Sequence, residues 1–272
     1  MMANIIEKYA ELPKPLRKPL WQWWHKRMIK FDSENIANFM NYGYSNLNGD
    51  PQIVLNKDDE TDRYCIQLYD HVVRKSEVSG KDMLEVGSGR GGGASYITRY
   101  YKPKLYIGMD ITPKSISFCN KHYKDIKGLT FKYGNAEKLP FENNKFDFVV
   151  NVESARCYNN QDAFFKEVFR VLKSNGKLLL ADMVYPEELE SLKNKILKAG
   201  FIISSETNIS NNVVKALEKD SARREHLIDT KAPKIFRKYF KTFAGTIGTS
   251  RYNNFATGVF QYWSFIIEKN LN

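Results

Sequence analysis

The chain has 272 residues, which is enough for one large domain or two small ones, and 42% hydrophobic residues with 27% charged residues exclude global disorder. Three widely spaced cysteines, Cys65, Cys119 and Cys157, argue against a disulfide scaffold and a structural zinc site, and we expect no metal. A net charge of +11 is spread along the chain, although nucleic-acid binders gather Lys and Arg on one face.

Residues 1–80 are predicted to form an N-terminal helical lid or substrate segment. The spacing of Leu20, Trp21, Trp24 and Met28 indicates one apolar face of a helix, with Lys side chains elsewhere around it. A second helix is expected near residues 64–75. The N-terminus lacks the apolar core of a signal peptide, and no apolar run is long enough to cross a membrane. We therefore expect a reducing, cytoplasmic location.

Residues 81–186 alternate short apolar runs with helical patterns. The expected strands and helices follow one another at 82–86, 94–101, 105–109, 113–123, 129–133, 146–150, 162–172 and 177–181. Strands that alternate with helices of this length are typical of a parallel, doubly wound sheet. The remaining residues read as a helix, a strand, a helical insert at about 211–255 and a closing strand. The sequence therefore predicts an α/β Rossmann-like core over residues 81–272, with a mostly parallel seven-stranded sheet.

In a doubly wound sheet the ligand lies beyond the carboxyl ends of the strands. A glycine-rich loop, Gly87-Ser-Gly89-Arg-Gly-Gly92, follows the first strand, and Asp110 follows the second, where an acid can accept both ribose hydroxyls. The spacing also matches a dinucleotide site, but Glu85 ends the first strand. A carboxylate there repels a pyrophosphate and suits a cationic ligand, which favours S-adenosylmethionine.

Three motifs in order resemble the class I S-adenosylmethionine-dependent methyltransferases. They are Leu84-Glu-Val-Gly-Ser-Gly-Arg-Gly91, Gly134-Asn-Ala-Glu-Lys-Leu-Pro-Phe141 and the block from Phe164 to Asp182. The resemblance covers roughly residues 35–272. Within the family, the chain is similar to the small-molecule and lipid subgroup, which includes phthiotriol and phenolphthiotriol dimycocerosate O-methyltransferases and, more distantly, sterol C-methyltransferases.

The resemblance implies S-adenosyl-L-methionine as cofactor, with Glu85 near its amino group, Asp110 on the ribose and Ile111 on the adenine. Asn135 stands where the family usually has Asp, and its amide oxygen can still accept a hydrogen bond from the adenine amino group. Tyr42 and Tyr44 are expected to close over the cofactor. The full expected set is Tyr42, Tyr44, Glu85, Gly87, Ser88, Gly89, Gly91, Asp110, Ile111, Asn135, Ala136, Glu137 and Asn151.

Methyl transfer to a hydroxyl needs alignment and a base. The closest subgroup typically has His at the position of Arg156, and this chain does not. Glu153, at the tip of the fourth predicted strand, is our first candidate for the base. His226, in the C-terminal insert, is the second, although a surface position on a helix is the more ordinary interpretation of it.

The segments that flank the core are expected to choose the acceptor. Residues 231–251 carry six basic side chains and no acidic ones, with aromatic residues at helical spacing. Together with the segment 20–31, they predict a hydrophobic acceptor and peripheral contact with a membrane surface. The expected substrate-contacting residues are Gln67, Arg156, Tyr158, Trp24 and Phe240.

Three functions remain open at this level. The first is an O-methyltransferase acting on a hydroxyl of a lipid-, polyketide- or phenol-like molecule. The second is a C- or N-methyltransferase on a sterol-like or amine acceptor, which Glu153 without a neighbouring His keeps open. The third is a basic nucleic-acid-binding module, which the net charge of +11 suggests. The Asn-Pro-Pro-Tyr-type signature of amino-group nucleic-acid methyltransferases is absent after the fourth predicted strand, where Asn151-Val-Glu-Ser stands. The sequence does not indicate the oligomeric state.

Overall fold

The computed structural model describes residues 37–47 and 53–269. The amphipathic helix expected at residues 20–31, with Trp24, lies outside these residues. Residues 37–272 form one compact unit, so the helix expected near 64–75 folds with the core. The division that we expected at residue 80, between a lid or substrate segment and the methyltransferase core, remains a prediction.

Seven strands form one sheet, and each lies at or around a predicted apolar run. They are β1 (Asp82–Val86), β2 (Leu105–Asp110), β3 (Leu129–Tyr133), β4 (Phe146–Val152), β5 (Leu172–Val184), β6 (Ile202–Asn208) and β7 (Gln261–Glu268). β5 begins directly where the preceding helix ends at Val171, five residues earlier than its apolar run predicts. Pairing with β4 and β7 on either side extends it beyond its own hydrophobic pattern.

The α-helices of the described residues are α3 (Arg63–Val73), α4 (Gly92–Tyr101), α5 (Pro113–His122), α6 (Gln161–Val171), α7 (Leu189–Lys198), α8 (Ser210–Lys231), α9 (Arg237–Ala244) and α10 (Ser250–Ala256). Short 3-10 turns occupy Lys57–Asp62, Ala155–Cys157, Pro186–Glu188 and Lys234–Phe236. Local chemistry sets several starts. Pro113 lies in the first turn of α5, and the Asn160 side chain accepts a hydrogen bond from the Ala163 N–H at α6.

The strand order is β3-β2-β1-β4-β5-β7-β6. β1 to β5 pair in parallel, whereas β7 runs antiparallel to both β5 and β6. This confirms the mostly parallel, doubly wound sheet, and it places the topological switch point between β1 and β4. The residues that follow those two strands therefore meet at the edge where such sheets bind ligands.

Two hydrophobic cores lie on the two faces of the sheet, because successive side chains of a strand point to opposite sides. Met83 packs in the core that includes residues of α3, α4, α5 and α8, whereas Leu84 packs in the core that includes α6 and α7. Glu85 shares a face with Met83. The carboxylate predicted to face a ligand therefore lies on the α3 side of the sheet.

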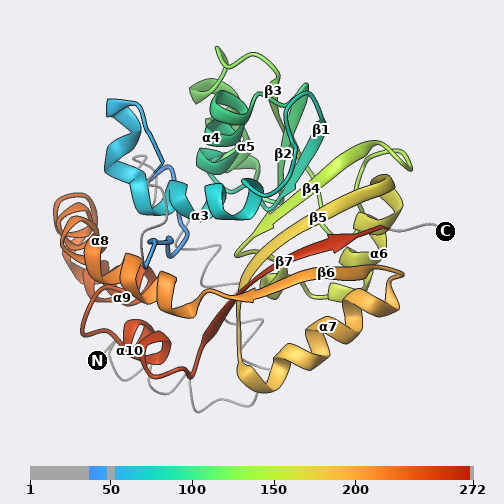
Figure 1. Ribbon diagram of the computed structural model, residues 1–272. Coiled ribbons are helices and arrows are strands. Elements are labelled where there is room, and N and C mark those ends of the chain that lie inside the picture. The colour runs from blue at the N-terminus through green and yellow to red at the C-terminus, as the bar shows by residue number, and fades with distance from the viewer. Residues whose placement is uncertain (1–36, 48–52, 270–272) are drawn as a thin grey trace. The chain divides into compact units, whose positions relative to one another are not determined.

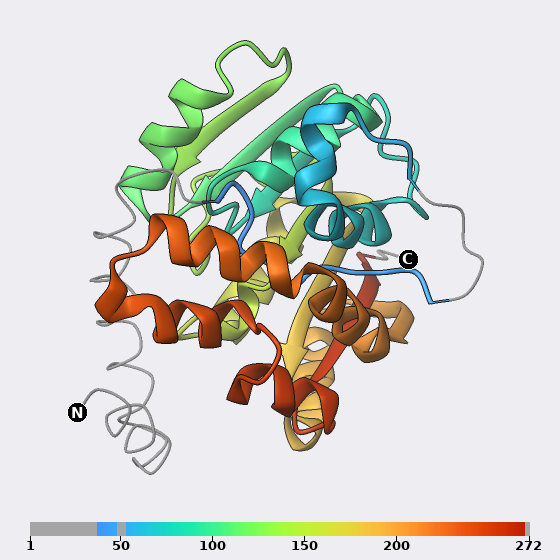
Figure 2. The same cartoon turned by 90° about the vertical axis from the view of Figure 1, so that its left-hand side faces the viewer.

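The helical insert lies at the carboxyl ends of the parallel strands. Figure 1 shows α8, α9 and α10 beyond the left end of the sheet, and the arrowhead of β7 points to the right. Since β7 is antiparallel to β5, the parallel strands finish on the left, beside these helices. In Figure 2, which faces that side, α8 and α9 lie in front of the strands. The expected insert thus covers the ligand-binding edge.

Candidate active site

The glycine-rich loop after β1 is fastened to β2. The N–H groups of Gly87 and Ser88 donate to the Met109 carbonyl at 2.8 and 3.0 Å, and the Gly89 N–H donates to Oδ2 of Asp110 at 2.9 Å. The Ser88 hydroxyl is buried and finds no hydrogen-bond partner within the part of the chain that the structure describes. The loop and the tip of β2 therefore form one fixed edge.

Two glycines of this loop have no space for a side chain. A Cβ atom on Gly87 would lie 2.3 Å from the Ser154 hydroxyl, and one on Gly91 would lie 2.7 Å from the Phe131 ring. Both residues also have positive φ angles, 80° and 77°, which side chains disfavour. The requirement for glycine comes from close packing on both sides of the loop.

Glu85 lies behind the loop, fully buried. Its Oε1 accepts from the Tyr69 hydroxyl at 2.9 Å and its Oε2 from the Tyr106 hydroxyl at 3.0 Å. Burial raises the pKa of Glu85 to about 7, against the lowering effect of these two hydrogen bonds. Both oxygens of this carboxylate are thus held by tyrosines, and its expected position near a cofactor amino group remains a prediction.

Asp110 and Ile111 lie at the surface beside the loop. Asp110 is half-buried and uses Oδ1 to accept from the Thr112 N–H at 2.8 Å, and Ile111 is 58% exposed. Each carboxylate oxygen can accept more than one hydrogen bond, so Asp110 retains capacity for ligand hydroxyls. An exposed isoleucine next to it offers a flat apolar surface.

The residues of the second motif, Gly134 to Phe141, divide between the surface and the interior. Asn135 is exposed and its Oδ1 accepts from the Glu137 N–H at 2.9 Å, while Ala136 is buried. Glu137 accepts from the Asn160 N–H, also at 2.9 Å, at the start of α6. Glu137 thus has a structural role, because its carboxylate binds a backbone N–H beside the start of α6.

Asn151 and Tyr158 support the loop from β4. The Asn151 amide, completely buried, donates to the Val86 carbonyl at 2.9 Å and lies within hydrogen-bond distance of the Ser154 and Tyr158 hydroxyls. The Tyr158 hydroxyl is 2.8 Å from Ser154 Oγ. Tyr158, which we expected to contact substrate, therefore packs directly beneath Gly87.

Glu153 follows β4 and adopts an unusual left-handed backbone conformation, with φ of 54°. Its Oε1 accepts from the Tyr42 N–H at 2.8 Å and from the Tyr262 hydroxyl at 2.9 Å. Oε2 accepts no hydrogen bond from the described residues, and it is not among their buried unpaired atoms. Burial raises the pKa of Glu153 to about 7, although Arg156 and both hydrogen bonds lower it. The carboxyl can therefore exchange a proton near neutral pH.

Arg156 is paired with an acid at the end of β5. Its guanidinium forms an ion pair with Asp182, which is 5% exposed, and its backbone N–H donates to the other Asp182 oxygen at 3.1 Å. This pair fixes Arg156 near Glu153, where the subgroup typically has His.

Tyr42 and Tyr44 lie in one extended segment but face different neighbours. The Tyr42 ring packs edge-on against Phe255 of α10, with centroids 4.9 Å apart, whereas the Tyr44 ring stacks on His71 of α3 at 4.5 Å. Arg224 of α8 donates to the Tyr42 carbonyl at 3.1 Å. Tyr42 therefore joins the Glu153 cluster, while Tyr44 is buried against α3.

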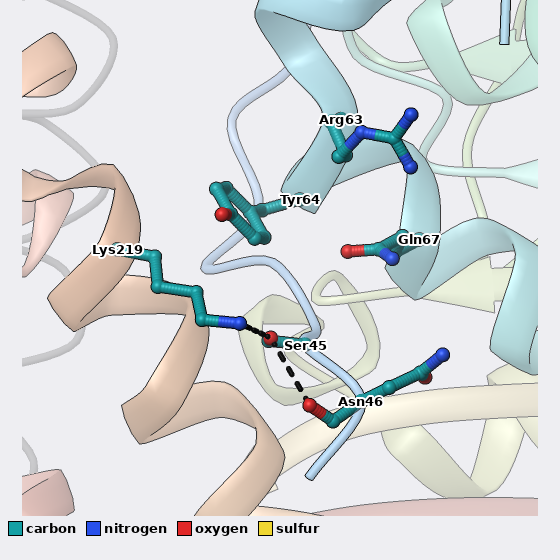
Figure 3. A pocket seen from close by; sticks show the side chains of 6 residues that line it. All are labelled: Ser45, Asn46, Arg63, Tyr64, Gln67 and Lys219. Atoms are coloured by element: carbon teal, nitrogen blue, oxygen red, sulfur yellow. Dashed lines mark hydrogen bonds between the residues drawn. The ribbon is translucent and has the colours of Figure 1, made fainter. Parts of the chain in front are cut away.

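Gln67 lines a small hollow of about 80 Å³ between α3, α8 and the segment after Tyr44. Figure 3 shows its side chain facing Tyr64 and Lys219, and Lys219 Nζ donates to Ser45 Oγ at 3.0 Å. The Gln67 Oε1 atom is buried without a partner among the described residues. The hollow is lined by Ser45, Asn46, Arg63, Tyr64, Gln67 and Lys219. The hydrogen bonds of the Glu153 carboxylate come from other residues, Tyr42 and Tyr262.

His226 and Phe240 lie in the helical insert, in α8 and α9 respectively. Arg224 is buried and reaches Tyr42, whereas His226 is exposed two positions further along the same helix. Two residues of an α-helix are about 200° apart around its axis, so His226 faces away from Tyr42. Phe240, in α9, is half-buried and packs against Tyr239 at 5.7 Å.

Several residues of the site were not found from the sequence. They are Tyr69, Tyr106, Asp182, Arg224, Arg251 and Tyr262, which hold Glu85, Arg156 or Tyr42 or lie beside them. Asp182 had a usable signal, because it lies at the carboxyl end of the β5 run. Among residues 37–47 and 53–269, no group of three His, Cys, Asp or Glu side chains could hold a metal ion.

Comparison with known proteins matches residues 84–180 to a family model described as a methyltransferase domain. The chain is 38% identical over 207 residues to a fatty-acid O-methyltransferase of Mycolicibacterium smegmatis, covering 75% of this chain and 74% of that protein. It is 35% identical over 240 residues to a phthiotriol/phenolphthiotriol dimycocerosates methyltransferase of Mycobacterium leprae, covering 86% and 87%. The structure of the cyclopropane synthase MmaA2 from Mycobacterium tuberculosis aligns with a TM-score of 0.66 at 13% identity, covering 88% and 95%.

Proposed function

This chain belongs to the S-adenosylmethionine-dependent methyltransferases, and on that premise we propose that it transfers a methyl group to a hydroxyl of a hydrophobic, lipid-like acceptor. Two relatives more than 30% identical carry names that specify lipid acceptors, a fatty acid in one case and phthiotriol compounds in the other. The observation that carries the proposal is Glu153, a half-buried carboxylate after β4, with one oxygen that accepts no hydrogen bond from the described residues.

The residues around the loop fit S-adenosylmethionine, which is the cofactor of this family. Asp110 would hold the ribose hydroxyls, Ile111 would cover the adenine and the backbone around Gly89 would carry the methionine part. A Cβ atom on Gly89 would meet only the end of the Met40 side chain, at 3.0 Å, so this side of the loop is bounded by a flexible group. When bound, the cofactor supplies a methyl group activated by a positively charged sulfur.

Glu153 would act on the acceptor through Oε2. Oε1 is occupied by Tyr42 and Tyr262, so the carboxyl is fixed in orientation and only one oxygen is available. With a pKa of about 7, a large fraction is ionised at neutral pH and can take the hydroxyl proton. The ion pair with Asp182 would hold the Arg156 guanidinium in place near Glu153, so that Asp182 and not Glu153 is its ion-pair partner.

The acceptor side of the proposal includes contact with a membrane surface. Lys234 and Lys238 are exposed beside Ile235, which is 64% exposed, and Ile247, beyond α9, is 50% exposed. No residue of α9 is fully buried. Basic side chains beside exposed apolar ones favour an anionic bilayer surface. No helix of the described residues is long and apolar enough to span a membrane.

The proposed reaction is tested by incubating the purified protein with methyl-labelled cofactor and a lipid extract of its host. We expect label in a hydrophobic product that yields a methyl ether on chemical degradation. Label on a ring or chain carbon, or on an amine nitrogen, would instead support a C- or N-methyltransferase. Label in RNA or DNA added in parallel would contradict the lipid acceptor.

A further inference from the structure

Arg251, in the first turn of α10, presents a guanidinium without an acidic partner. Its carbon lies 5.1 Å from the centre of the Phe260 ring, and its Nη1 is 3.5 Å from the Met183 sulfur. Among the described residues, no carboxylate lies within ion-pair distance of it. The side chain is half-buried, so its charge is held against an apolar surface rather than extended fully into water.

This guanidinium lies beside the Glu153 cluster. Burial raises the pKa of Tyr42, and of the three arginines that oppose this rise Arg251 acts most strongly. The Tyr42 ring packs on Phe255 of α10, and the Tyr42 N–H donates to Glu153. Met183 pairs with Tyr262 across β5 and β7, and the Tyr262 hydroxyl also donates to Glu153. Two independent routes therefore lead from Arg251 to the proposed base.

The other two arginines that act on Tyr42 are neutralised by acids. Arg156 is paired with Asp182, and Arg224 is paired with the buried Asp220 at 2.7 Å. Arg251 thus contributes one uncompensated positive charge at the edge of a buried aromatic cluster. A guanidinium held in this way gains most from an anion that matches its planar fork, as a carboxylate does.

We propose that Arg251 binds a carboxylate on the hydrophobic acceptor, which makes acidic amphiphiles the preferred substrates of this site. The proposal rests on the function proposed above and specifies its substrate class. A single uncompensated charge matches a monovalent carboxylate better than a phosphomonoester, which carries nearly two negative charges at neutral pH. The alkyl part would lie beside the half-buried Arg251 side chain, at the edge of the buried cluster of Tyr42, Phe255 and Phe260.

The test is a binding measurement that does not depend on turnover. Calorimetry with S-adenosylhomocysteine present would compare dodecanoate with 1-dodecanol, which share a chain and differ in the charge of the head group. We expect the wild type to bind dodecanoate about tenfold or more tightly, the usual gain from a hydrogen bond to a charged group. Arg251→Gln should abolish this preference, and Arg251→Lys should restore part of it. Lys198→Gln, at an exposed position at the end of α7, should leave it intact.

The outcomes separate this proposal from the proposed function. Equal binding of acid and alcohol by the wild type, or an undiminished preference in a folded Arg251→Gln protein, would overturn the role of Arg251. Thermal unfolding would confirm that each variant is folded. An Arg251-dependent preference for dodecanoate in a protein that methylates no lipid hydroxyl would support the binding site and contradict the proposed reaction.

Discussion

One glutamate of the candidate site is held through only one of its two oxygens. Glu153 adopts a left-handed φ of 54°, a conformation that costs a non-glycine residue on the order of 1 kcal/mol. Its N–H donates to the Ala181 carbonyl at 2.8 Å, and Oε1 accepts from Tyr42 and Tyr262. Contacts from three distant segments thus offset the free-energy cost of the left-handed backbone conformation and fix the orientation of the carboxyl group.

Replacing Glu153 by Gln should remove the base and leave the fold intact. We expect turnover on a hydroxyl acceptor to fall about 10²-fold to 10⁴-fold while cofactor affinity is unchanged. In the wild type the ionised carboxyl is the active form, so kcat/KM should rise with pH through about 7 and level off above it. The measurement is a pH–rate profile beside a cofactor titration.

Tyr262→Phe is the matched control for this profile. It removes one hydrogen bond that lowers the pKa of Glu153, so the rise should move to higher pH while activity at alkaline pH is largely kept. Unchanged turnover in Glu153→Gln, or a profile without a rise near pH 7, would exclude Glu153 as the base.

Asp110 gives a second prediction, for cofactor binding. Asp110→Asn keeps the size of the side chain but removes the charge, and a charged acceptor makes a stronger hydrogen bond than a neutral one. We expect S-adenosylmethionine affinity to fall about tenfold or more in calorimetry. Glu137→Gln, whose carboxylate already serves the Asn160 N–H, should bind like the wild type. Equal losses in both variants would contradict the distinction between them.

The position of a residue after a strand was predictable, but its partners were not. The sequence places Asp110 and Glu153 at strand ends, because each follows a clear apolar run. It does not reveal that Tyr42 and Tyr262, 111 and 109 residues away, share one oxygen of Glu153. Local patterns carry no information on such distant pairs.

At the level of elements, α3 and β2 are both linked to the end of β1 by a tyrosine that hydrogen-bonds to Glu85. Tyr69 of α3 and Tyr106 of β2 donate to opposite oxygens of Glu85. The helical and strand patterns predicted all three elements, with boundaries within about two residues at β1 and α3. They did not predict this cross-link, because the tyrosines read as ordinary core residues.

The raised pKa of Glu85 predicts how stability depends on pH. Its folded-state pKa of about 7 exceeds its ordinary value of 4.5, so the folded protein binds the proton more tightly. The free energy of unfolding should therefore decrease as pH rises from about 4.5 to 7, by about 3 kcal/mol from this residue. Urea unfolding at pH 5 and pH 8 measures this loss.

Glu85→Gln should reduce that loss, since the variant has no carboxyl to ionise at this place. Glu153 contributes a separate loss over the same range, because its pKa is also raised to about 7. Some pH dependence should therefore remain in Glu85→Gln and decrease further in the double variant with Glu153→Gln. If Glu85→Gln loses as much unfolding free energy between pH 5 and pH 8 as the wild type does, the assignment to Glu85 is contradicted.

α8 is fastened to the site segment by Arg224. This buried side chain donates to Asp220, to the Asn41 and Tyr42 carbonyls and to the carbonyl of Ala244, the last residue of α9. Arg224→Met should lower the free energy of unfolding by about 3 kcal/mol, because buried acceptors lose their donor. Lys215→Met, which breaks an exposed pair with Glu218 on the same helix, should cost less than about 1 kcal/mol. Equal losses in chemical denaturation would contradict a special role for Arg224.

At the scale of the whole molecule, the fold explains part of the net charge of +11. The basic residues of the insert lie over the carboxyl edge of the sheet, where Figure 1 places α8 to α10. The alternation of strands and helices was sufficient to predict the layers and the ligand edge. It was not sufficient to predict which charges are neutralised, since ion pairs such as Arg99–Asp59 join segments 40 residues apart.

Binding to anionic vesicles tests whether the charge on the insert has a directed role. We expect the protein to sediment with vesicles of phosphatidylglycerol and phosphatidylcholine at low salt, and to dissociate as salt screens the charges. Changing the exposed Lys231, Lys234 and Lys238 to Gln should weaken binding on the order of a hundredfold, at about 1 kcal/mol for each lysine. The same change at the exposed Lys121, Lys124 and Lys127 alters net charge equally, at and just beyond the end of α5, and should have little effect. Equal weakening by both triple variants would show that net charge alone acts, and absence of binding by the wild type would contradict membrane contact altogether.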